Sequence, residues 1–260
     1  MSDTDWSLVG DAAALRAHGL FVVEGRLVLQ RLLDLCDAGA SWHVVRVLAS
    51  PAAVRALRLD ERCAGRLDVR PADDMQRLTG FNFHRGVLAL VRRPPVPPVE
   101  PWLAGLRDDL PLVLAEHLVD VDNVGSVFRN ARALGAAGVL LDDTSADPLY
   151  RKAVRTSMGT VLDLPWTQAV RGTAWAQVRA AGYRLMALTP APGAVPLRDA
   201  ILEARGGRLA IVVGNEGAGL TDEALAACEV RVRIPMEEGA DSLNVATALA
   251  LALYEARALR

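Results

Sequence analysis

The sequence predicts an α/β protein, with a mostly parallel sheet covered by helices on both faces in the second half and a small α/β sandwich domain before it. Short apolar segments alternate with helical patterns along the chain, which is typical of strands joined by crossover helices. A run with five prolines in eight positions, "PPVPPVEP", separates the two halves. Because proline lacks a backbone N–H and restricts the preceding residue, we expect no helix or central strand there. We therefore predict domains at 1–93 and 102–260 with a linker at 94–101.

The composition indicates a globular protein with a sizeable core, since 52% of its 260 residues are hydrophobic and 23% are charged. The net charge of -2 does not favour a nucleic-acid binder on charge alone, so an anionic partner would need a local basic patch. Lys152 is the only lysine. Arginine, which binds phosphate through a planar fork, supplies the rest of the positive charge.

Neither a metal site nor a membrane span is expected. Cys36, Cys63 and Cys228 lie far apart and, with four scattered histidines, form no metal-ligand or disulfide spacing. The N-terminus lacks the basic-then-apolar order of a signal peptide, and the longest apolar stretch, 243–254, is too short to cross a bilayer. We expect a cytoplasmic protein.

In the first half, strands and helices should alternate. The apolar segments at 20–25, 42–50 and 86–93 predict strands. The pattern at 26–36 predicts an amphipathic helix, and Pro51 should open a short second helix because proline is tolerated in a first helical turn. This alternation predicts the small α/β sandwich.

The second half shows the same alternation over more elements. Its apolar segments predict strands at 111–118, 137–143, 183–190, 208–214 and 230–236. Its helical patterns lie at 123–134, 148–159, 173–182 and 221–228, and from about 243 onward. Thr221 is the expected N-cap of the helix that follows it. Ligands of such sheets bind beyond the carboxyl ends of the strands, so we expect function in the loops there.

The first such loop leads into "NVGSVFRNA". Asn123 is the predicted N-cap of a helix whose apolar side chains recur at helical spacing on one face. Arg129 should project from the opposite face. This pattern fits either an active-site edge or an ordinary capped helix with Arg129 in solvent.

Two further loops have a similar layout. In "VVGNEGAGL", three glycines follow a strand, which indicates backbone that turns tightly or leaves room for a ligand. The spacing is neither that of a P-loop nor that of the dinucleotide fingerprint. Glu216 could accept hydrogen bonds or pair with an arginine, and a plain glycine turn is the alternative. In "IPMEEGADSLNVATALA", Ser242 is the predicted N-cap of the last helix and Asn244 lies in its first turn, and both residues can be purely structural.

Together the three loops resemble the SpoU (TrmH) family of RNA ribose methyltransferases in the SPOUT superfamily. They fit its Asn-x-Gly-x-x-x-Arg, Gly-x-Glu-x-x-Gly and Ile-Pro-Met…Ser-Leu-Asn-Val motifs, in order, across 110–260. More loosely, "FVVEGRLVLQRLL" and "FHRGVLALV" resemble the ribosomal-protein-like substrate-binding domain of many members. The chain departs from the family at Val121, where proline is frequent, and at Asn215, where Ser or Thr is common. These departures concern the shape of the loops.

The resemblance implies a deep trefoil knot in the C-terminal part, S-adenosylmethionine bound in that knot, and a homodimer. It also implies methyl transfer to a ribose 2′-hydroxyl of RNA, with ribosomal RNA favoured over transfer RNA. The dimer interface should include the helix at 124–134 and the last helix, because "LNVATALALALY" is apolar almost all round and must be covered. A catalytically silent RNA-binding module is the alternative, although the motif side chains are intact. A dehydrogenase or a hydrolase would need fingerprints that the chain lacks.

Site residues follow from the same resemblance. Arg129 should bind the phosphate next to the acceptor and stabilise the developing alkoxide, because a guanidinium stays protonated at any ordinary pH and makes a poor base. Asn123 and Glu216 should orient Arg129 and the ribose, and Ser242 and Asn244 should position the nucleotide. The residues expected to hold the cofactor are Leu188, Thr189, Val213, Gly214, Asn215, Gly217, Ile234, Met236, Ser242 and Leu243.

RNA phosphates are expected at a second group of basic residues. Arg151, Lys152 and Arg155 belong to the helical pattern at 148–159, and solvation at the surface is the alternative for them. The polar turn "FHRG" either presents Arg85 and His84 to RNA or is a plain turn. The predicted RNA-binding set consists of Arg85, Arg129, Arg151, Lys152 and Arg155.

Overall fold

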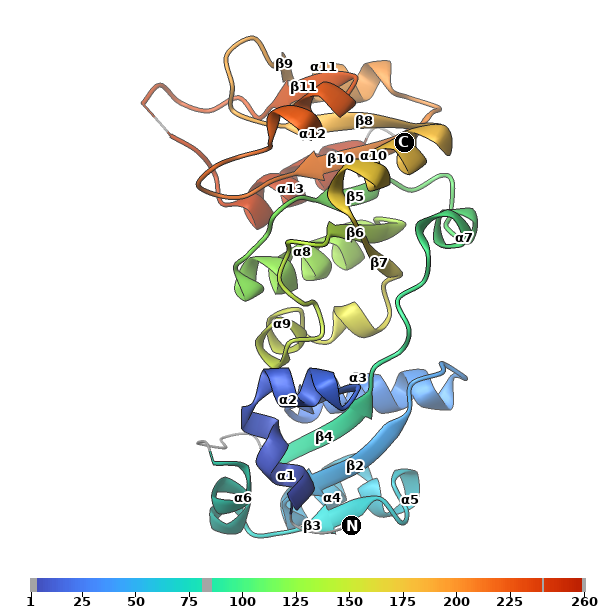
Figure 1. The fold of residues 1–260 in the computed structure, drawn as a ribbon, viewed down its shortest axis with the longest axis vertical. Coiled ribbons are helices and arrows are strands. Elements are labelled where there is room, and N and C mark those ends of the chain that lie inside the picture. The colour runs from blue at the N-terminus through green and yellow to red at the C-terminus, as the bar shows by residue number, and fades with distance from the viewer. Residues whose placement is uncertain (1–3, 81–85, 240, 259–260) are drawn as a thin grey trace. The chain divides into compact units, whose positions relative to one another are not determined.

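The computed structural model describes residues 4–80, 86–239 and 241–258, and these residues form two compact units. The first unit contains Met1–Pro95 and also Pro148–Asp163, and the second contains Val96–Asp147 and Leu164–Arg260. A division at the proline run alone would therefore assign the segment at 148–163 to the other unit. Each unit has its own sheet (Figure 1).

The first unit is built on a four-stranded sheet in the order β1-β4-β2-β3. β4 (Val87–Arg92) runs antiparallel to β1 (Leu20–Glu24) and to β2 (Val44–Ala49), and β3 (Leu67–Val69) is parallel to β2. The strands predicted at 20–25, 42–50 and 86–93 are confirmed. β3 was not predicted, since its three residues are too few for a periodic pattern.

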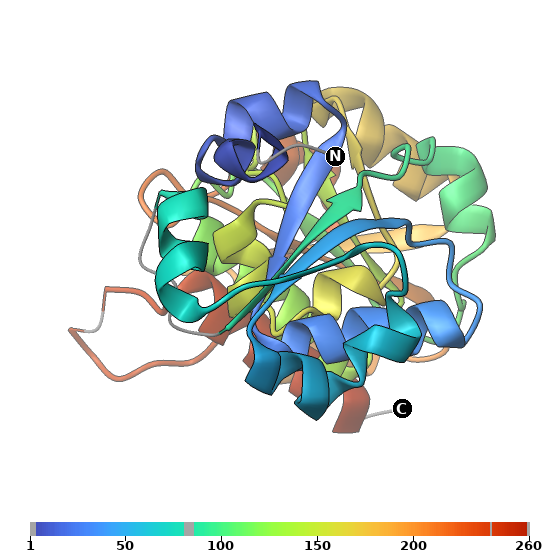
Figure 2. The same cartoon turned by 90° about the horizontal axis from the view of Figure 1, so that it is seen from below.

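Helices lie on both sides of this sheet. α1 (Thr4–Ser7) and α2 (Ala12–Ala17) lie on one side, and α3 (Arg26–Asp37), α4 (Pro51–Leu57) and α5 (Leu59–Arg62) lie on the other (Figure 2). The predicted helix at 26–36 and the one opened by Pro51 are confirmed. Ser50 caps α4 by accepting a hydrogen bond from the Ala53 backbone N–H at 3.3 Å.

Four more helical segments belong to the described part of the first unit, and two of them come from the distant part of its chain. They are the 3-10 helix η1 (Leu8–Gly10), α6 (Ala72–Thr79), α9 (Arg151–Thr156) and the 3-10 helix η2 (Thr160–Leu162). α9 packs against β1. The Trp42 indole N–H donates to the Leu162 backbone oxygen at 2.9 Å, which fixes the end of this segment. The helix predicted at 148–159 is thus shorter than expected, because Pro148 and Leu149 stay outside it.

The second unit holds a seven-stranded sheet in the order β7-β6-β5-β10-β8-β11-β9, in which every neighbouring pair is parallel. The strands are β5 (Leu112–Ala115), β6 (Gly138–Asp142), β7 (Trp166–Ala169), β8 (Tyr183–Leu188), β9 (Val195–Pro196), β10 (Arg208–Val213) and β11 (Val230–Arg233). The predicted parallel sheet is confirmed. β7 and β9 were not predicted, because β7 is a short strand of mixed polarity and the two residues of β9 are too few for a periodic pattern.

Two sets of helices cover this sheet. In one set, α10 (Arg171–Ala180) contacts both α7 (Val99–Ala104) and α12 (Asp222–Ala227); in the other, α13 (Val245–Ala258) contacts both α8 (Val121–Leu134) and α11 (Leu197–Glu203). Buried residues of α7 and α10 form one core with the strands they cover, including Trp102, Trp175 and Leu185. The predicted helices in this half are confirmed, and Thr221 caps α12 as expected by accepting from the Ala224 N–H at 3.2 Å.

The expectation that no helix enters the proline run is wrong. α7 begins at Val99 with Pro98 as its N-cap, and Pro101 lies in its first turn. The first backbone N–H groups of a helix have no partner inside the helix, so a proline there costs no hydrogen bond. Residues 93–98 form neither helix nor strand, as predicted.

Candidate active site

The candidate site is a cavity at the carboxyl ends of β8, β10 and β11, and all of its lining residues belong to the second unit. It encloses about 430 Å³, and its lining comes from the loops after these strands and from the first turns of α13. All ten residues that the resemblance assigned to the cofactor, of which Leu188 is the first and Leu243 the last in the chain, line this cavity, and so does Glu216. The structure therefore brings these residues together at one place, as the topology of a parallel sheet predicts.

The glycine loop after β10 folds back on itself at the cavity. The Gly219 N–H donates to the Asn215 backbone oxygen at 2.9 Å, and Gly219 has a φ of +71°. A Cβ atom placed on Gly214 would lie 2.8 Å from the backbone carbonyl of Gly219. Gly214 is thus required by a close approach of two backbone segments, which is the physical reason for the first glycine of this motif.

Asn215 holds this loop through both ends of its amide. Its Oδ1 accepts from the N–H groups of Gly217 at 2.9 Å and Ala218 at 3.0 Å. Its Nδ2 donates to the backbone oxygen of His117 at 3.1 Å. Asn215, which stands where Ser or Thr is common in the family, therefore links the glycine loop to the loop after β5. A Ser or Thr hydroxyl has one donor hydrogen and a shorter side chain, so it would form fewer of these hydrogen bonds.

The predicted N-cap of α8 is wrong. α8 begins at Val121, and its N-cap is Asp120, whose carboxylate accepts from the Asp122 N–H at 2.7 Å. Asp120 is as good a cap as an asparagine and comes earlier in the chain. Asn123 consequently lies inside the first turn, where its side chain is available for other partners.

Asn123 forms hydrogen bonds with one residue from each of the other two motifs. We call these three residues, Asn123, Glu216 and Asn244, the motif cluster. Its Nδ2 donates to Glu216 Oε1, and its Oδ1 accepts from Asn244 Nδ2 at 2.9 Å. Glu216 and Asn244 are exposed and Asn123 is half-buried. A hydrogen-bonded chain of three side chains, each from a different loop, is not needed to build any single helix or turn.

Ser242 is not the cap of the last helix, contrary to expectation. Among the described residues, Asn244 caps α13, accepting from the N–H groups of Ala246 at 3.0 Å and Thr247 at 3.3 Å. Because α13 starts at Val245, a cap must lie immediately before it, and Ser242 comes too early. Ser242 is exposed and lines the cavity.

Arg129 is exposed on α8, as predicted, and its guanidinium makes no hydrogen bond or ion pair with any residue that the structure describes. On the other side of the helix, Val124, Val127 and Phe128 are fully buried. The next residue, Asn130, donates to the Ala246 backbone oxygen at 2.7 Å and links α8 to α13. Arg129 is therefore held on a well-packed helix with its own charge unused.

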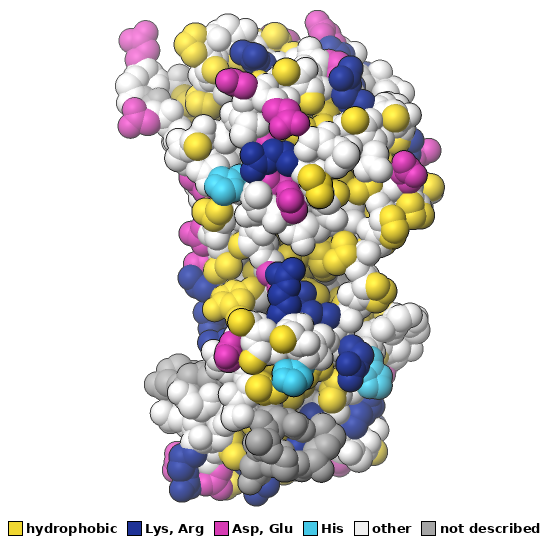
Figure 3. All heavy atoms as spheres, viewed as in Figure 1, with side chains coloured by type: hydrophobic (Ala, Val, Ile, Leu, Met, Phe, Trp, Pro, Cys, Tyr) yellow, Lys and Arg dark blue, Asp and Glu magenta, His cyan; other side chains and the backbone are white. Residues whose placement is uncertain are grey.

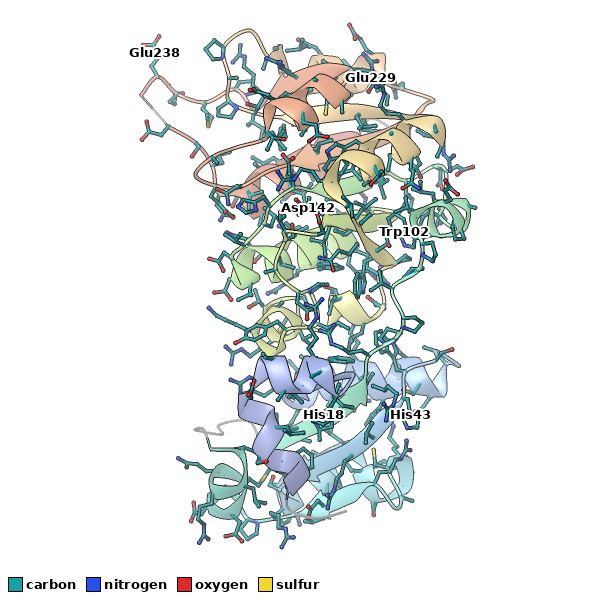
Figure 4. All side chains as sticks on the ribbon, in the orientation of Figure 1. His18, His43, Trp102, Asp142, Glu229 and Glu238 are labelled. Atoms are coloured by element: carbon teal, nitrogen blue, oxygen red, sulfur yellow. The ribbon has the colours of Figure 1, made fainter. Side chains whose placement is uncertain are left out.

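A second group of polar residues lies at the carboxyl ends of β5 and β6, and we call it the carboxylate network. It consists of Glu116, Asp142, Thr144 and Arg171. Glu116 directly follows β5 and Asp142 is the last residue of β6, and both are 0% exposed. Figure 4 shows Asp142 at the end of its strand. Burial by itself raises the pKa of Asp142, but hydrogen bonds from Ser145, Thr144 and the His117 N–H, together with the charge of Arg171, lower its pKa below the ordinary value. Asp142 is thus a carboxylate at neutral pH.

Two short segments of the sequence carry a signal for this network. "EH" and "DDTS" each follow an apolar strand directly. Polar residues at the carboxyl ends of neighbouring parallel strands meet at one edge of the sheet, so the pairing of Glu116 with Asp142 was predictable once β5 and β6 were placed side by side. Arg171 is the first residue of a helix that carries no sequence motif, so the sequence did not predict a role for Arg171.

The residues predicted to contact RNA phosphates fall into three groups. Arg151 and Arg155 each lie 3.6 Å from Glu24 Oε2 in the first unit, a partner that the sequence did not reveal. Lys152 is exposed, and Lys and Arg side chains gather over the segment that carries α9 on the face shown in Figure 3. Arg85 and His84 lie outside the described residues.

The described residues provide neither a metal site nor a reactive cysteine at Cys228. No group of three or more His, Cys, Asp and Glu side chains within the described ranges could hold a metal ion. Burial raises the pKa of the Cys228 thiol to about 12, with help from the nearby charges of Glu229 and Glu116, so Cys228 is no thiolate nucleophile. Of the helices that the structure describes, none is both long and apolar enough to cross a membrane.

Comparison with known proteins gives a consistent result. A model of the SpoU rRNA methylase family matches residues 111–254. A Mycobacterium tuberculosis protein named an uncharacterized tRNA/rRNA methyltransferase is 42% identical over 238 residues, which cover 91% of this chain and 80% of that protein. The 23S rRNA (guanosine-2′-O-)-methyltransferase RlmB of Acinetobacter baylyi is 32% identical over 71% of this chain and 75% of its own.

A solved structure agrees over nearly the whole length. It is that of the SpoU methyltransferase AviRb from Streptomyces viridochromogenes in complex with the cofactor AdoMet. It superposes with a TM-score of 0.81 at 27% identity, covering 98% of this chain and 97% of AviRb. The similarity therefore includes both units.

Proposed function

The chain belongs to the SpoU rRNA methylase family, and from that premise we propose that it transfers the methyl group of S-adenosylmethionine to a ribose 2′-hydroxyl of structured RNA. RlmB, a 32% identical relative, is named for 2′-O-methylation of 23S rRNA, and AviRb was solved with AdoMet. Ribosomal RNA is the substrate we favour over transfer RNA.

One observation supports this proposal most directly. The motif cluster joins Asn123, Glu216 and Asn244 from three loops, and Glu216 also lines the cavity that the predicted cofactor residues share. Acceptor-side and cofactor-side groups thus meet at the carboxyl edge of one parallel sheet. Such an arrangement suits a reaction between two bound substrates, because their relative position sets the rate.

The cavity suits S-adenosylmethionine in size and chemistry. A volume of about 430 Å³ lies within the range of roughly 300–1,000 Å³ that small-molecule sites occupy. Leu188, Ile234 and Leu243 offer apolar contacts, and the loop backbones offer polar groups for a purine and a ribose. The Glu216 carboxylate suits a ligand with a positive sulfonium. When bound, this cofactor supplies an already activated methyl group.

The residues of the chain then have to align the acceptor oxygen and ease the loss of its proton. Arg129 carries a permanent charge, so we assign it to the phosphate beside the acceptor and to the developing alkoxide rather than to proton abstraction. Asn123 and Glu216 would orient the ribose, and Ser242 and Asn244 would position the nucleotide. The catalytic set is therefore Arg129, Asn123, Glu216, Ser242 and Asn244.

RNA recognition would involve both units. We propose residues 1–93 as the ribosomal-protein-like binding domain, joined by 94–101 to the methyltransferase domain at 102–260. Arg151, Lys152 and Arg155 would contact phosphates, and we propose the same role for Arg85, which lies outside the described residues. The buried Glu24 supports this role, because it holds two arginines close together on one face of α9.

We also propose the deep knot and the homodimer that family membership implies. Support for the dimer comes from α13, which packs against α8 and buries Leu249 and Leu253. The same helix leaves Leu251 42% exposed and Tyr254 62% exposed. A second copy that covered these side chains would bury apolar area that is otherwise in water. Light scattering at micromolar concentration tests this point.

The proposed activity is tested with methyl-labelled S-adenosylmethionine and in-vitro transcripts of bacterial 23S rRNA, 16S rRNA and a transfer RNA pool. We expect label in 23S rRNA at one nucleotide, in a form that resists alkaline hydrolysis because the 2′-oxygen is blocked. Calorimetry should show binding of S-adenosylmethionine. A protein that binds the transcripts but neither binds the cofactor nor transfers label would be a silent RNA-binding module instead.

A further inference from the structure

We propose that Arg171, which belongs to none of the three motifs, is a positioning residue for methyl transfer and acts through the carboxylate network on the loops that carry Asn123 and Glu216. This inference rests on the proposed function. Arg171 is the first residue of α10, and its side chain is 26% exposed. Among the described residues it contacts neither Asn123 nor Glu216, so any effect on the reaction must pass through its partners.

Arg171 lies between two buried carboxylates. Its Nε is 3.2 Å from Asp142 Oδ2 and 3.5 Å from Glu116 Oε1, and its Nη2 donates to Thr144 Oγ1 at 2.9 Å. Both acidic side chains are 0% exposed and lose their hydration, so the Arg171 guanidinium between them supplies the positive charge that offsets this burial at one edge of the sheet. The guanidinium fork contacts three acceptors at once, which an ammonium cannot.

Glu116 holds one end of the glycine loop. Its two oxygens accept from the Thr221 N–H at 2.9 Å and from the Thr221 hydroxyl at 2.7 Å. Thr221 caps α12 immediately after the loop, while Asn215 links the start of the loop to His117. Both ends of the segment that carries Glu216 are therefore attached to two consecutive residues, Glu116 and His117.

Asp142 holds those residues in turn. It accepts from the His117 N–H at 3.0 Å, and His117 has a φ of 53°, in the left-handed region that side chains rarely adopt. The Thr144 hydroxyl donates its one hydrogen to Asp142 Oδ2 at 2.7 Å, so His117 Nδ1, at 3.0 Å from that hydroxyl, must be the donor of their bond. Backbone and ring of His117 are both fixed, and the strained loop that leads into α8 is kept in one conformation.

These contacts set the separation of two loops. One loop leads from Glu116 to Asn123, and the other contains Glu216, and the Asn123–Glu216 hydrogen bond closes the gap between them. Weakening the grip of Arg171 lets the loops shift by fractions of an ångström without unfolding, because Glu116 and Asp142 keep their other donors. Small misplacements of groups that align an acceptor reduce the rate strongly. Cofactor affinity should change less, because the loops after β8 and β11 are outside the network.

The test is Arg171→Lys, which keeps the charge and loses the fork, with Arg208→Lys as the matched control. Arg208 is similarly exposed, at 29%, and binds the Ala181 backbone oxygen at 2.7 Å and Asp108 at the opposite ends of the strands. With a 23S rRNA transcript, we expect kcat of Arg171→Lys to fall at least tenfold while KM for S-adenosylmethionine changes less than threefold. Arg208→Lys should stay within twofold of the unchanged protein. All rates are measured well below the melting temperature of each variant.

A double-mutant cycle separates positioning from general damage. In an Asn123→Ala background, Arg171→Lys should lower kcat less than threefold further, because the group it positions is gone. A full tenfold loss on that background, an equal loss in Arg208→Lys, or a kcat within twofold of the unchanged protein would overturn the inference. If the unchanged protein methylates no transcript, the proposed function fails instead, and the two failures are thereby distinguished.

Discussion

The motif cluster and the carboxylate network lie at the same edge of one sheet, yet their polar groups are used very differently. In the motif cluster Glu216 and Asn244 are exposed, and Arg129 nearby on α8 makes no polar contact with the described residues. In the network Glu116 and Asp142 are fully buried, and Asp142 alone accepts from His117, Thr144, Ser145 and Arg171. The exposed groups, which we propose to meet a ligand, keep unused hydrogen-bonding capacity, whereas the buried Asp142 carboxylate is engaged by several donors within the chain.

The difference teaches which property each region should lose on mutation. A side chain with unused capacity contributes little to folding, because nothing in the chain depends on it. A buried carboxylate with several donors contributes to stability, because its removal leaves those donors unsatisfied. We therefore expect activity and stability to separate cleanly between the two regions, and the following experiments test that separation.

The largest effect on activity is expected from Arg129→Ala. It removes a cation from the acceptor side and should cost about 3 kcal/mol or more of transition-state stabilisation, a hundredfold loss of kcat/KM. Arg129→Lys should restore little, because an ammonium cannot form the bidentate contact with a phosphate. Rates on a 23S rRNA transcript measure this effect.

Two controls accompany Arg129→Ala. Its melting temperature should match that of the unchanged protein, since Arg129 is exposed and no described residue depends on it. Calorimetry should show nearly unchanged affinity for S-adenosylmethionine. A folded variant with a near-normal rate would remove Arg129 from the mechanism, and a loss of cofactor binding would move it to the other half of the site.

Asp142→Asn should show the opposite behaviour and destabilise the fold by roughly 2–3 kcal/mol at pH 7, because an amide cannot accept all the bonds that the carboxylate accepts. The pKa of Asp142 is lowered in the folded state, so its contribution is fully present above about pH 4, its ordinary range, and is lost as the pH falls through the folded pKa. Urea unfolding should therefore show a gap between the two proteins that is constant from pH 7 to pH 5 and narrows at lower pH.

The matched control is Asp109→Asn. Asp109 is 61% exposed and pairs with the exposed Arg107 at 2.7 Å, so its loss should change stability by less than about 0.5 kcal/mol. Equal destabilisation by the two variants would mean that the network is no more important to the fold than a surface ion pair.

These two regions also differ in how far the sequence predicted them. The alternation of apolar segments predicted the parallel sheet, and the motifs predicted that Asn123, Glu216 and Asn244 would meet. Motif residues are visible in one sequence because their spacing is local. The carboxylate network is assembled from 116, 142 and 171, and only the pairing of β5 with β6 and the start of α10 bring these positions together.

The errors in the helix starts have a common cause. Asp120 and Asn244 cap α8 and α13, where Asn123 and Ser242 were expected. In both segments several good capping residues occur within a few positions, and propensity alone does not choose among them. Capping by Asp120 leaves the Asn123 side chain free to join the motif cluster, for which we propose a catalytic role.

Gly214→Ala tests the glycine loop, the backbone segment that carries part of the motif cluster and is attached to the carboxylate network. The added Cβ would lie 2.8 Å from the Gly219 carbonyl, so the glycine loop must open, and the cavity it lines must change shape. We expect affinity for S-adenosylmethionine to fall at least tenfold, equivalent to about 1.4 kcal/mol, as measured by calorimetry. Gly105→Ala is the control, since its nearest contact would be an ordinary 3.6 Å from the Trp102 oxygen. Unchanged affinity in Gly214→Ala would show that the loop does not shape the cofactor site.

The smallest effect is expected at Arg155, whose side chain combines features of both regions. It is 39% exposed, like a ligand-binding group, yet lies 3.6 Å from the buried Glu24, like a structural one. Arg155→Gln removes one positive charge from the predicted phosphate contacts of α9. We expect RNA affinity to fall about threefold to tenfold and the slope of log affinity against log salt concentration to decrease by about one.

The control is Arg198→Gln, which removes an equal charge from the 71% exposed Arg198 that pairs with Glu255 in the second unit. Filter binding of a 23S rRNA transcript at several salt concentrations compares the two variants. If both variants lower the slope equally, net charge rather than a contact explains the result, and α9 loses its assigned role. If only Arg155→Gln lowers it, an arginine anchored on one side by a buried carboxylate still has enough free guanidinium to hold a phosphate on the other.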